Sequence, residues 1–339
     1  MTIYVAFVVL LVCASIFVNG WTDSPNAIAT VVSTRVLPPR IAILMGACFN
    51  FLGVFLMGSA VARTTAGIVT LGTGTEALIT LAAAQVAIVL WAVGAWRFGI
   101  PTSESHALIA GLMGAGMSLN GLDAFSWPSL QKVVYGLLIS TFAGFAAGFA
   151  LTFLIKMISI AVQPNARKAN RFFSFGQMGS AALMAFSHGA QDGQKFMGVL
   201  YLALILGGVY SDPGSSHWTI PTWIMALCSI IMAVGTSIGG FRIIKTMGMD
   251  MVRLEKYQGF GAELAASGSM IVATIFGIPL STTNTKATAM MGAGAVKGFN
   301  RVNWGVAREM IIAWVLTFPA CLILGYLSAM FFRYIVQYL

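Results

Sequence analysis

The sequence predicts an all-α polytopic membrane protein made of two inverted repeats. Three observations predict this fold: the composition is strongly apolar, the apolar residues form long runs, and the two halves of the chain resemble each other. Of the 339 residues, 58% are hydrophobic and only 9% are charged. Soluble globular proteins carry about 25% charged residues, so this composition excludes a soluble fold.

The apolar runs have the length of membrane-spanning helices, which need roughly 20 residues. They cover residues 3–18, 41–61, 77–96, 133–155, 220–238 and 311–332. The first run is not a cleavable signal peptide, because it lacks a basic start and leads into a polar motif. The four cysteines lie inside apolar runs without metal-binding spacing, which indicates buried apolar residues.

A repeated motif relates the two halves. Gly-Ile-Pro-x-Ser begins at Gly99 and again at Gly277, and each copy runs on to Met-Gly-Ala-Gly with the same spacing. A second pair of polar segments, which end at Asp23 and Asp192, lies upstream of the Gly-Ile-Pro motif in each half. Matched features in one order indicate two related halves.

Basic loops set the expected orientation of these halves. Lys and Arg gather around residues 35–40, 156–171, 242–256 and 297–301, with Arg63 the one clear exception. The positive-inside rule places these four loops in the cytoplasm. All four lie there if each Gly-Ile-Pro motif turns a re-entrant hairpin, over about 77–120 from outside and 259–296 from inside. The halves are then inverted, which is the design of secondary transporters with binding at broken helices near the membrane midplane.

The chain therefore divides into a first inverted repeat (1–160), a basic cytoplasmic linker (161–175) and a second inverted repeat (176–339). Each repeat is expected to contain a broken helix, a spanning helix, a re-entrant hairpin and a further spanning helix. The expected crossings are 1–34, 41–62 and 128–156, then 176–209, 219–240 and 305–335. Both termini are expected outside the cell.

The first polar segment, Asn19 to Asn26, interrupts an apolar run. Gly20 and Pro25 allow the helix to unwind there. Asp23 then lies near the middle of the membrane, where a carboxylate is costly and usually functional. A short surface loop between two short helices is the alternative.

The second polar segment, Ser187 to Lys195, interrupts the matching span. Asp192 and Lys195 are three residues apart and share a helix face, so a structural ion pair is one interpretation. The matching Asp23 has no such lysine, which favours a functional role for the aspartates.

The two Gly-Ile-Pro segments present hydroxyl groups beside free backbone N–H groups. Proline is tolerated near a helix start, and a helix N-terminus with hydroxyls suits an anion. Two such ends can converge on a tetrahedral oxyanion, whereas ordinary N-capping is the alternative. The hydroxyl residues are Thr102, Ser103 and Ser105 in the first hairpin and Ser281, Thr282 and Thr283 in the second. Glycines downstream are expected to allow close helix packing: Gly111, Gly114, Gly116, Gly292 and Gly294.

These motifs together resemble the PiT family of inorganic phosphate transporters, along the whole chain and in order. The family pattern appears here as Asn19 to Ala27, Ser187 to Lys195, Gly99 to His106 and Gly277 to Asn284. The resemblance implies sodium- or proton-coupled uptake, with phosphate held by the hairpin hydroxyls and cations by the aspartate segments. The sequence departs from the pattern at Thr22, Glu104, Gln191, Asn284 and Lys286, which leaves the coupling ion open and sulfate as an alternative cargo.

We assign two groups of site residues on this basis. Phosphate is expected at the six hairpin hydroxyl residues together with Gln194 and Lys195. Cation coupling is expected at Asn19, Asp23, Asn26, Glu104, Gln191, Asp192 and Glu263, with Asp23 and Asp192 as ligands if the ion is sodium. Glu263 and its repeat mate Gln85 either line the site or bond between helices, and Arg97 either reaches for the interface or attracts anions.

Charge balance explains why such a site needs coupling. Phosphate carries about −1 to −2 near neutral pH, and buried carboxylates add further negative charge, so cations or protons have to neutralise them. No cofactor is expected, and the expected partners are phosphate, sodium or protons and the lipid bilayer of a bacterial cell membrane. Nucleic acid is not expected, and a homodimer stays open. An anion channel and an intramembrane Ser/His enzyme are the distant alternatives, the latter without an HExxH motif to support it.

Overall fold

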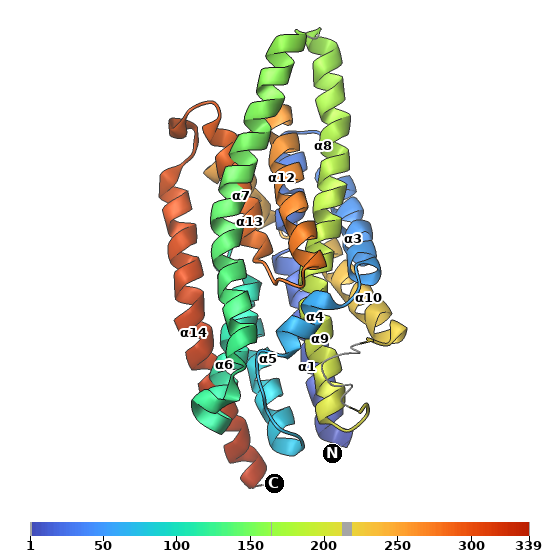
Figure 1. The fold of residues 1–339 in the computed structure, drawn as a ribbon, viewed down its shortest axis with the longest axis vertical. Helices are drawn as coiled ribbons and strands as arrows, with labels where there is room; N and C mark the ends of the chain where they lie inside the picture. Colours follow the sequence, from blue (N-terminus) through green and yellow to red (C-terminus); the bar gives the residue numbers. More distant parts are fainter. Residues whose placement is uncertain (1, 164, 212–218, 339) are drawn as a thin grey trace.

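The computed structural model describes residues 2–163, 165–211 and 219–338, and these ranges contain helices and turns but no strand longer than an isolated bridge. The helices run mostly along one long axis (Figure 1). Both chain ends lie at one end of the molecule, and the turn between α7 (Trp127–Val162) and α8 (Ala166–His188) lies at the other. The first half holds α1 (Thr2–Thr22), α2 (Pro25–Ser33), α3 (Pro39–Leu56), α4 (Ala60–Ala66), α5 (Thr75–Phe98), α6 (Glu104–Asn120) and α7 (Trp127–Val162).

The second half repeats this order of elements. It holds α8 (Ala166–His188), a π-helical segment (Gly189–Gly193), α9 (Gln194–Leu206), α10 (Thr222–Ile238), α11 (Phe241–Lys245), a second π-helical segment (Thr246–Met251), α12 (Lys256–Ile275), α13 (Thr282–Ala295) and α14 (Trp304–Gln337). Short 3-10 turns cover Gly121–Ala124 and Phe299–Arg301.

Five segments of the described chain are both long enough and apolar enough to span a membrane: Ile3–Ser33, Pro39–Leu56, Thr75–Phe98, Trp127–Val162 and Trp304–Gln337. A sixth is formed if Thr222–Ile238 and Phe241–Met251, which meet at 66°, act as one bent span. The prediction of a polytopic all-α membrane protein is confirmed. The bend in the sixth segment was not predicted, since 219–240 was expected to be a simple crossing.

The two predicted interruptions take different forms. Between α1 and α2 the helix breaks at Asp23 and Ser24, as the sequence predicts. The second polar segment does not unwind: the chain stays helical from α8 to α9 through the π-helical segment Gly189–Gly193. π-bulges of this kind occur frequently at functional sites. The expected linker, residues 161–175, is also mostly helix, because only 163–165 separate α7 from α8.

Both expected hairpins are present. α5 turns into α6 at Gly99 (φ +71°), and α12 turns into α13 at Gly277 (φ +64°), conformations that glycine adopts without steric cost. Each hairpin then packs on a long helix of the other half: α6 lies along α14, and α13 lies along α7.

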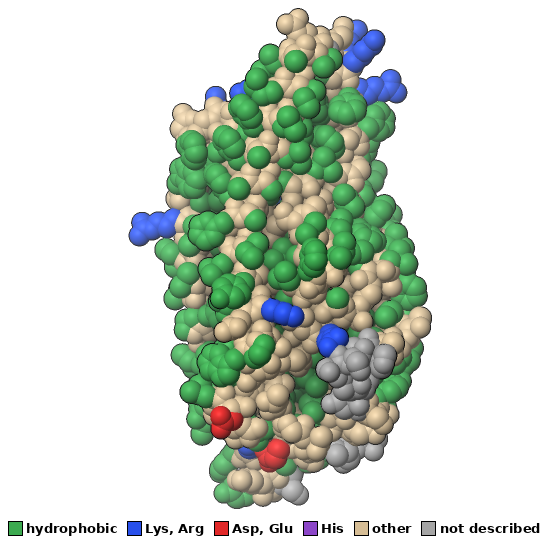
Figure 2. All heavy atoms as spheres, viewed as in Figure 1, with side chains coloured by type: hydrophobic (Ala, Val, Ile, Leu, Met, Phe, Trp, Pro, Cys, Tyr) green, Lys and Arg blue, Asp and Glu red, His purple; other side chains and the backbone are tan. Residues whose placement is uncertain are grey.

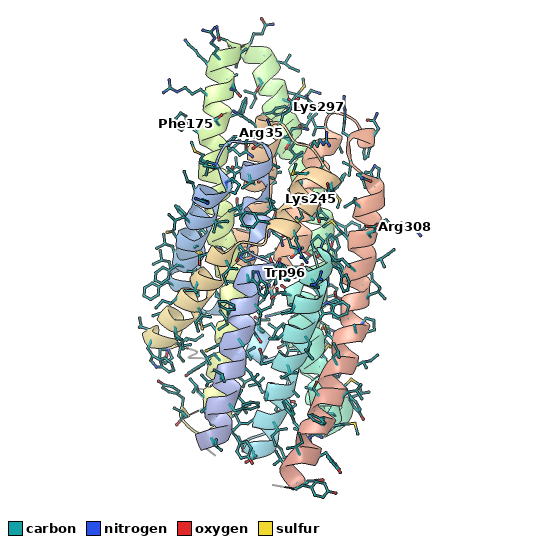
Figure 3. All side chains as sticks on the ribbon, turned by 180° about the vertical axis from the view of Figure 1, so that it is seen from behind. Arg35, Trp96, Phe175, Lys245, Lys297 and Arg308 are labelled. Carbon is teal, nitrogen blue, oxygen red and sulfur yellow. The ribbon has the colours of Figure 1, made fainter. Side chains whose placement is uncertain are left out.

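Charged side chains divide between the two ends of the molecule. Arg35, Lys245, Lys297 and Arg308 lie in the half that carries the α7–α8 turn (Figure 3). On the face shown in Figure 2, basic side chains lie near this turn and also about halfway along the molecule, whereas acidic side chains lie near the opposite end. This distribution agrees with the expected cytoplasmic position of the α7–α8 turn.

Candidate functional site

The two hairpins meet at the N-terminal ends of α6 and α13. Ser103 Oγ and Ser281 Oγ lie 2.7 Å apart. Each hydroxyl also caps its own helix, because Ser103 accepts from the backbone N–H of His106 (3.3 Å) and Ser281 from that of Asn284 (3.2 Å). N-capping and convergence were weighed as alternatives, and the structure combines them.

A pair of buried aspartates lies against the start of α13. The Thr282 hydroxyl lies 3.3 Å from Asp23 Oδ2 and 2.9 Å from Asp192 Oδ2, so it bridges the break in α1–α2 and the π-helical segment. Asp23 also accepts hydrogen bonds from Asn26 and Thr283. The two aspartates that the repeat relates between the halves therefore share one site.

Lys195 joins both hairpins to this pair. Its ammonium group donates to Asp192 Oδ1 (2.7 Å), to Ser105 Oγ (2.6 Å) and to the backbone carbonyl of Leu280. An ammonium has three donors, and all three are used. The Asp192–Lys195 ion pair, which was one of the two interpretations of this segment, is present. The same ammonium group also joins Ser105 of the first hairpin to the Leu280 carbonyl of the second.

Unused oxygen atoms beside the aspartates fit a cation. Within the described residues, the side-chain oxygens of Asn19 and Asn26 are buried and accept no hydrogen bond. Single ligand atoms from Asp23, Asp192 and His188 lie within 4.8 Å of one another. Carboxylate and amide oxygens suit hard cations such as sodium. His188 was not among the predicted site residues, although its position four residues before Asp192 places it on the same helix face.

Glu104 adds a third carboxylate from the first turn of α6. It is buried, accepts a hydrogen bond from Thr22 and lies beside Asn19. The structure therefore brings Glu104 to the aspartate cluster, as the assignment to cation coupling expects.

Three predicted residues lie at the edge of this arrangement. Gln191 supports the second hairpin, because its amide donates to Thr274 (2.9 Å) and Ile278 (3.2 Å) and accepts from the N–H of Leu280 (3.1 Å). Gln194 instead bonds to the backbone at Val61 and Met57, both at 3.0 Å, between α3 and α4. Thr102 is partly exposed just before the start of α6, and Arg97 is exposed outside the site.

Glu263 belongs to a second buried polar cluster. Its carboxylate lies 3.5 Å from the Lys286 ammonium and accepts from Ser180 (2.6 Å) and Thr30, and Lys286 also donates to Thr30 (3.1 Å). Both members of this ion pair are fully buried. Glu263 thus bonds between helices instead of joining Asp23 and Asp192. Its repeat mate Gln85 is buried too, and neither of its amide atoms has a hydrogen-bond partner among the described residues.

Comparison with known proteins shows the family to which the chain belongs. The sequence profile of the phosphate transporter family matches residues 19–325. A protein of Bacillus subtilis named "Probable low-affinity inorganic phosphate transporter" is 35% identical over 320 residues, which cover 94% of each chain. A protein of the same name from Rhizobium meliloti is 37% identical over 310 residues, which cover 91% of this chain and 90% of the relative.

A solved structure shares the fold. It is titled "The sodium-dependent phosphate transporter", covers 99% of this chain, and superposes with a TM-score of 0.86 at 22% sequence identity. The family consists of transporters, so the chain is not an enzyme and the intramembrane-enzyme alternative is rejected. The match of the family profile along nearly the whole chain shows that this protein is a multi-pass membrane protein of the phosphate transporter family.

Proposed function

We propose that this protein imports inorganic phosphate together with sodium ions, by alternating access across a bacterial cell membrane. The observation that carries the proposal is the meeting of two hydroxyl-bearing helix N-termini beside two buried aspartates. The names of the relatives and of the structural neighbour support the choice of phosphate and of sodium. Protons are the second candidate for the coupling ion.

The phosphate site consists of the ends of α6 and α13. Free N–H groups at a helix start favour an anion, and hydroxyl groups surround these helix starts, from Ser103, Ser105, Ser281, Thr282 and Thr283. The Lys195 ammonium, held between Ser105 and Leu280, supplies positive charge. Gln194 is left out of this proposed site because its amide bonds to the α3–α4 connection.

Coupling follows from the charge of the site. With Asp23, Glu104, Asp192 and Lys195 ionised, the net formal charge is −3 + 1 = −2. A phosphate of about −1 to −2 then binds well only when cations neutralise the buried carboxylates. Asp23 and Asp192 are the proposed sodium ligands, with the side-chain oxygens of Asn19 and Asn26 beside them.

A carboxylate beside the anion also bears on selectivity. Protonated phosphate can donate a hydrogen bond to a carboxylate, and sulfate cannot. Glu104, buried at the first turn of α6, is positioned to take that role. Sulfate that competes as well as phosphate for uptake would contradict this assignment.

Alternating access is assigned to motion of the hairpins about the site. In inverted-repeat transporters the repeats rock around a fixed binding site. We place the α7–α8 turn in the cytoplasm and both chain ends outside, so that α5–α6 enters from outside and α12–α13 from inside.

Uptake of labelled phosphate into proteoliposomes tests the function. A sodium gradient and a proton gradient are imposed separately, and Asp23→Asn is measured beside the unaltered protein. Uptake that is driven by the sodium gradient alone and is lost in the variant supports the proposal. Uptake that is driven by the proton gradient alone would show that the coupling ion is the proton and not sodium. Folded protein that transports no phosphate under either gradient contradicts the proposal and directs the search to sulfate.

A further inference from the structure

Two basic residues oppose the charge distribution that orients the protein. Arg63 on α4 and Lys132 near the start of α7 are exposed. Figure 1 shows α4 and the start of α7 in the half of the molecule that carries the chain ends, which we place outside. Arg333 at the same end pairs with Glu76 at 3.2 Å. Neither Arg63 nor Lys132 has an ion-pair partner in the described part of the chain. Their charges therefore need another explanation.

The two side chains line the same hollow. Its volume is about 830 Å³, and its described lining includes hydroxyl groups from Thr64, Ser126 and Ser129 but no acidic side chain. Figure 2 shows basic side chains on the face that carries α4 and α9, well apart from those near the α7–α8 turn. A cavity with two unpaired cations and several hydroxyls favours an anion.

The hollow reaches the hairpin that carries half of the phosphate site. Phe276 and Gly277, at the turn between α12 and α13, form part of its lining. The Thr64 hydroxyl donates to the Gly277 carbonyl (2.8 Å), so α4 is fixed against this turn. Gly277 precedes Ser281 by only four residues. An anion in the hollow would therefore lie against the turn that leads into α13.

We propose that this hollow is an outer vestibule that gathers phosphate before it enters the central site, with Arg63 and Lys132 as the attracting groups. The inference rests on the proposed function. Clefts lined with one sign of charge raise the local concentration and arrival rate of an oppositely charged substrate by about 10 to 10³. Because salt screens charges over about 8–10 Å at physiological ionic strength, the gain depends on ionic strength.

A lipid headgroup shares the phosphate chemistry of the substrate. Lysine and arginine at a membrane interface commonly reach toward headgroups. Both charges line one cavity, whose wall includes the α12–α13 turn, and this favours the free anion. The lipid composition of the vesicles separates these two sources in the test.

The first test measures uptake in right-side-out phosphatidylcholine proteoliposomes. Arg63→Gln, Lys132→Gln and the double variant are compared with Arg308→Gln, an exposed arginine in the other half of the molecule (Figure 3). In the double variant the half-saturating phosphate concentration is expected to rise by about tenfold, with an unchanged maximal rate and a weaker salt dependence. Arg308→Gln is expected to behave like the unaltered protein. An unchanged half-saturating concentration, or a loss of maximal rate alone, overturns the proposal.

The second test restores the charge chemically. Arg63→Cys is made together with Cys48→Ser, since Cys48 is the exposed native cysteine. A cationic thiol reagent is expected to restore the low half-saturating concentration, and an anionic reagent of similar size to raise it further. Equal effects of the two reagents would show a steric role and contradict the vestibule.

Two further outcomes separate the hypotheses. If the substitutions act only in vesicles that contain phosphatidylglycerol, the hollow holds a lipid headgroup and the proposal is wrong. If the unaltered protein takes up phosphate and the variants take it up equally well, the vestibule is contradicted and the proposed function is not. Absence of phosphate uptake in the unaltered protein contradicts the proposed function and the vestibule with it.

Discussion

Ser103 and Ser281 lie in different halves of the sequence, and their hydroxyl oxygens are 2.7 Å apart in the fold. They occupy the same position in the two copies of the Gly-Ile-Pro-x-Ser motif, and each caps the helix that follows. Contact between equivalent residues is expected when two repeats are related by an axis that passes between them. The relationship supports the assignment of two related halves, and the proposed site lies where they meet.

Ser103→Ala and Ser281→Ala test whether the two hydroxyls act jointly on phosphate. A hydrogen bond to a charged group contributes about 1.5–3 kcal/mol, so each variant is expected to raise the half-saturating phosphate concentration about tenfold or more. In the double variant the half-saturating concentration is expected to rise by less than the product of the two single fold-changes, because side chains in contact are not independent. Ser237→Ala, an exposed serine on α10, serves as the control. Independent effects of the two serines would contradict a shared anion.

The two aspartates are expected to respond differently to neutralisation. Asp192→Asn leaves the buried Lys195 without its carboxylate partner, which costs about 3–5 kcal/mol in a buried pair. Asp23→Asn leaves no buried ammonium behind, because the partners of Asp23 are hydroxyls and an amide. The thermal unfolding temperature in detergent is therefore expected to fall clearly for Asp192→Asn and little for Asp23→Asn. Sodium-driven uptake is expected to be lost in both variants. Equal destabilisation by the two substitutions would contradict this division of roles.

Much of the fold and of the central site is predictable from the sequence. Long apolar runs with few charges predict the spanning helices because a bilayer has no water to satisfy exposed polar groups. The motifs at Gly99 and Gly277 predict the hairpins, and the break at Asp23 follows from a polar segment inside an apolar run. Duplication adds information here, since a feature that occurs twice at one offset identifies residues that the fold brings together.

The contacts of individual side chains are less predictable. The segment around Asp192 contains two glycines and polar residues, a composition that suits an unwound segment and a π-helical one alike, and the packing of Gly189 and Gly193 against α3 is not readable from the segment itself. Gln194 adjoins Lys195 in sequence, yet the two side chains point to different neighbours. Glu263 matched Gln85 in the repeat, but the charge of Glu263 is met by Lys286, whereas Leu108 stands at the equivalent position of the first half.

The Glu263–Lys286 pair is expected to contribute to stability more than to ion binding. Glu263→Gln or Lys286→Met alone leaves one buried group unpaired, which costs about 3–5 kcal/mol, and the double variant is expected to recover part of that loss. The exposed pair Glu255–Lys297 offers the matched control, since surface ion pairs contribute only about 0.2–1 kcal/mol. A double-mutant cycle on thermal unfolding measures the coupling. If instead Glu263→Gln folds normally and abolishes sodium dependence, Glu263 belongs to the cation pathway as the sequence analysis assigned it.

Gly114 and Gly292 occupy equivalent positions in the two copies of the repeat and are expected to be irreplaceable for packing. A Cβ atom at Gly114 meets the Leu322 carbonyl oxygen of α14 at 1.9 Å, and one at Gly292 meets the Phe145 carbonyl oxygen of α7 at 2.2 Å. Backbone atoms cannot rotate away, so alanine at either position forces the hairpin helix off its neighbour, and overpacking of this kind costs about 1–3 kcal/mol.

Gly268 on α12 is the matched control for these two glycines, because a Cβ atom there meets nothing within 4 Å. Gly268→Ala is expected to unfold at the same or a slightly higher temperature, since alanine favours helix relative to glycine by about 0.5–1 kcal/mol. Gly114→Ala and Gly292→Ala are expected to lower both the unfolding temperature and the maximal uptake rate. The hydroxyls proposed to bind phosphate lie at the start of the helix that contains each glycine. A shift of that helix therefore displaces these hydroxyls as well. Uptake with unaltered kinetics in Gly292→Ala would show that close packing of α13 on α7 is not needed to position the site.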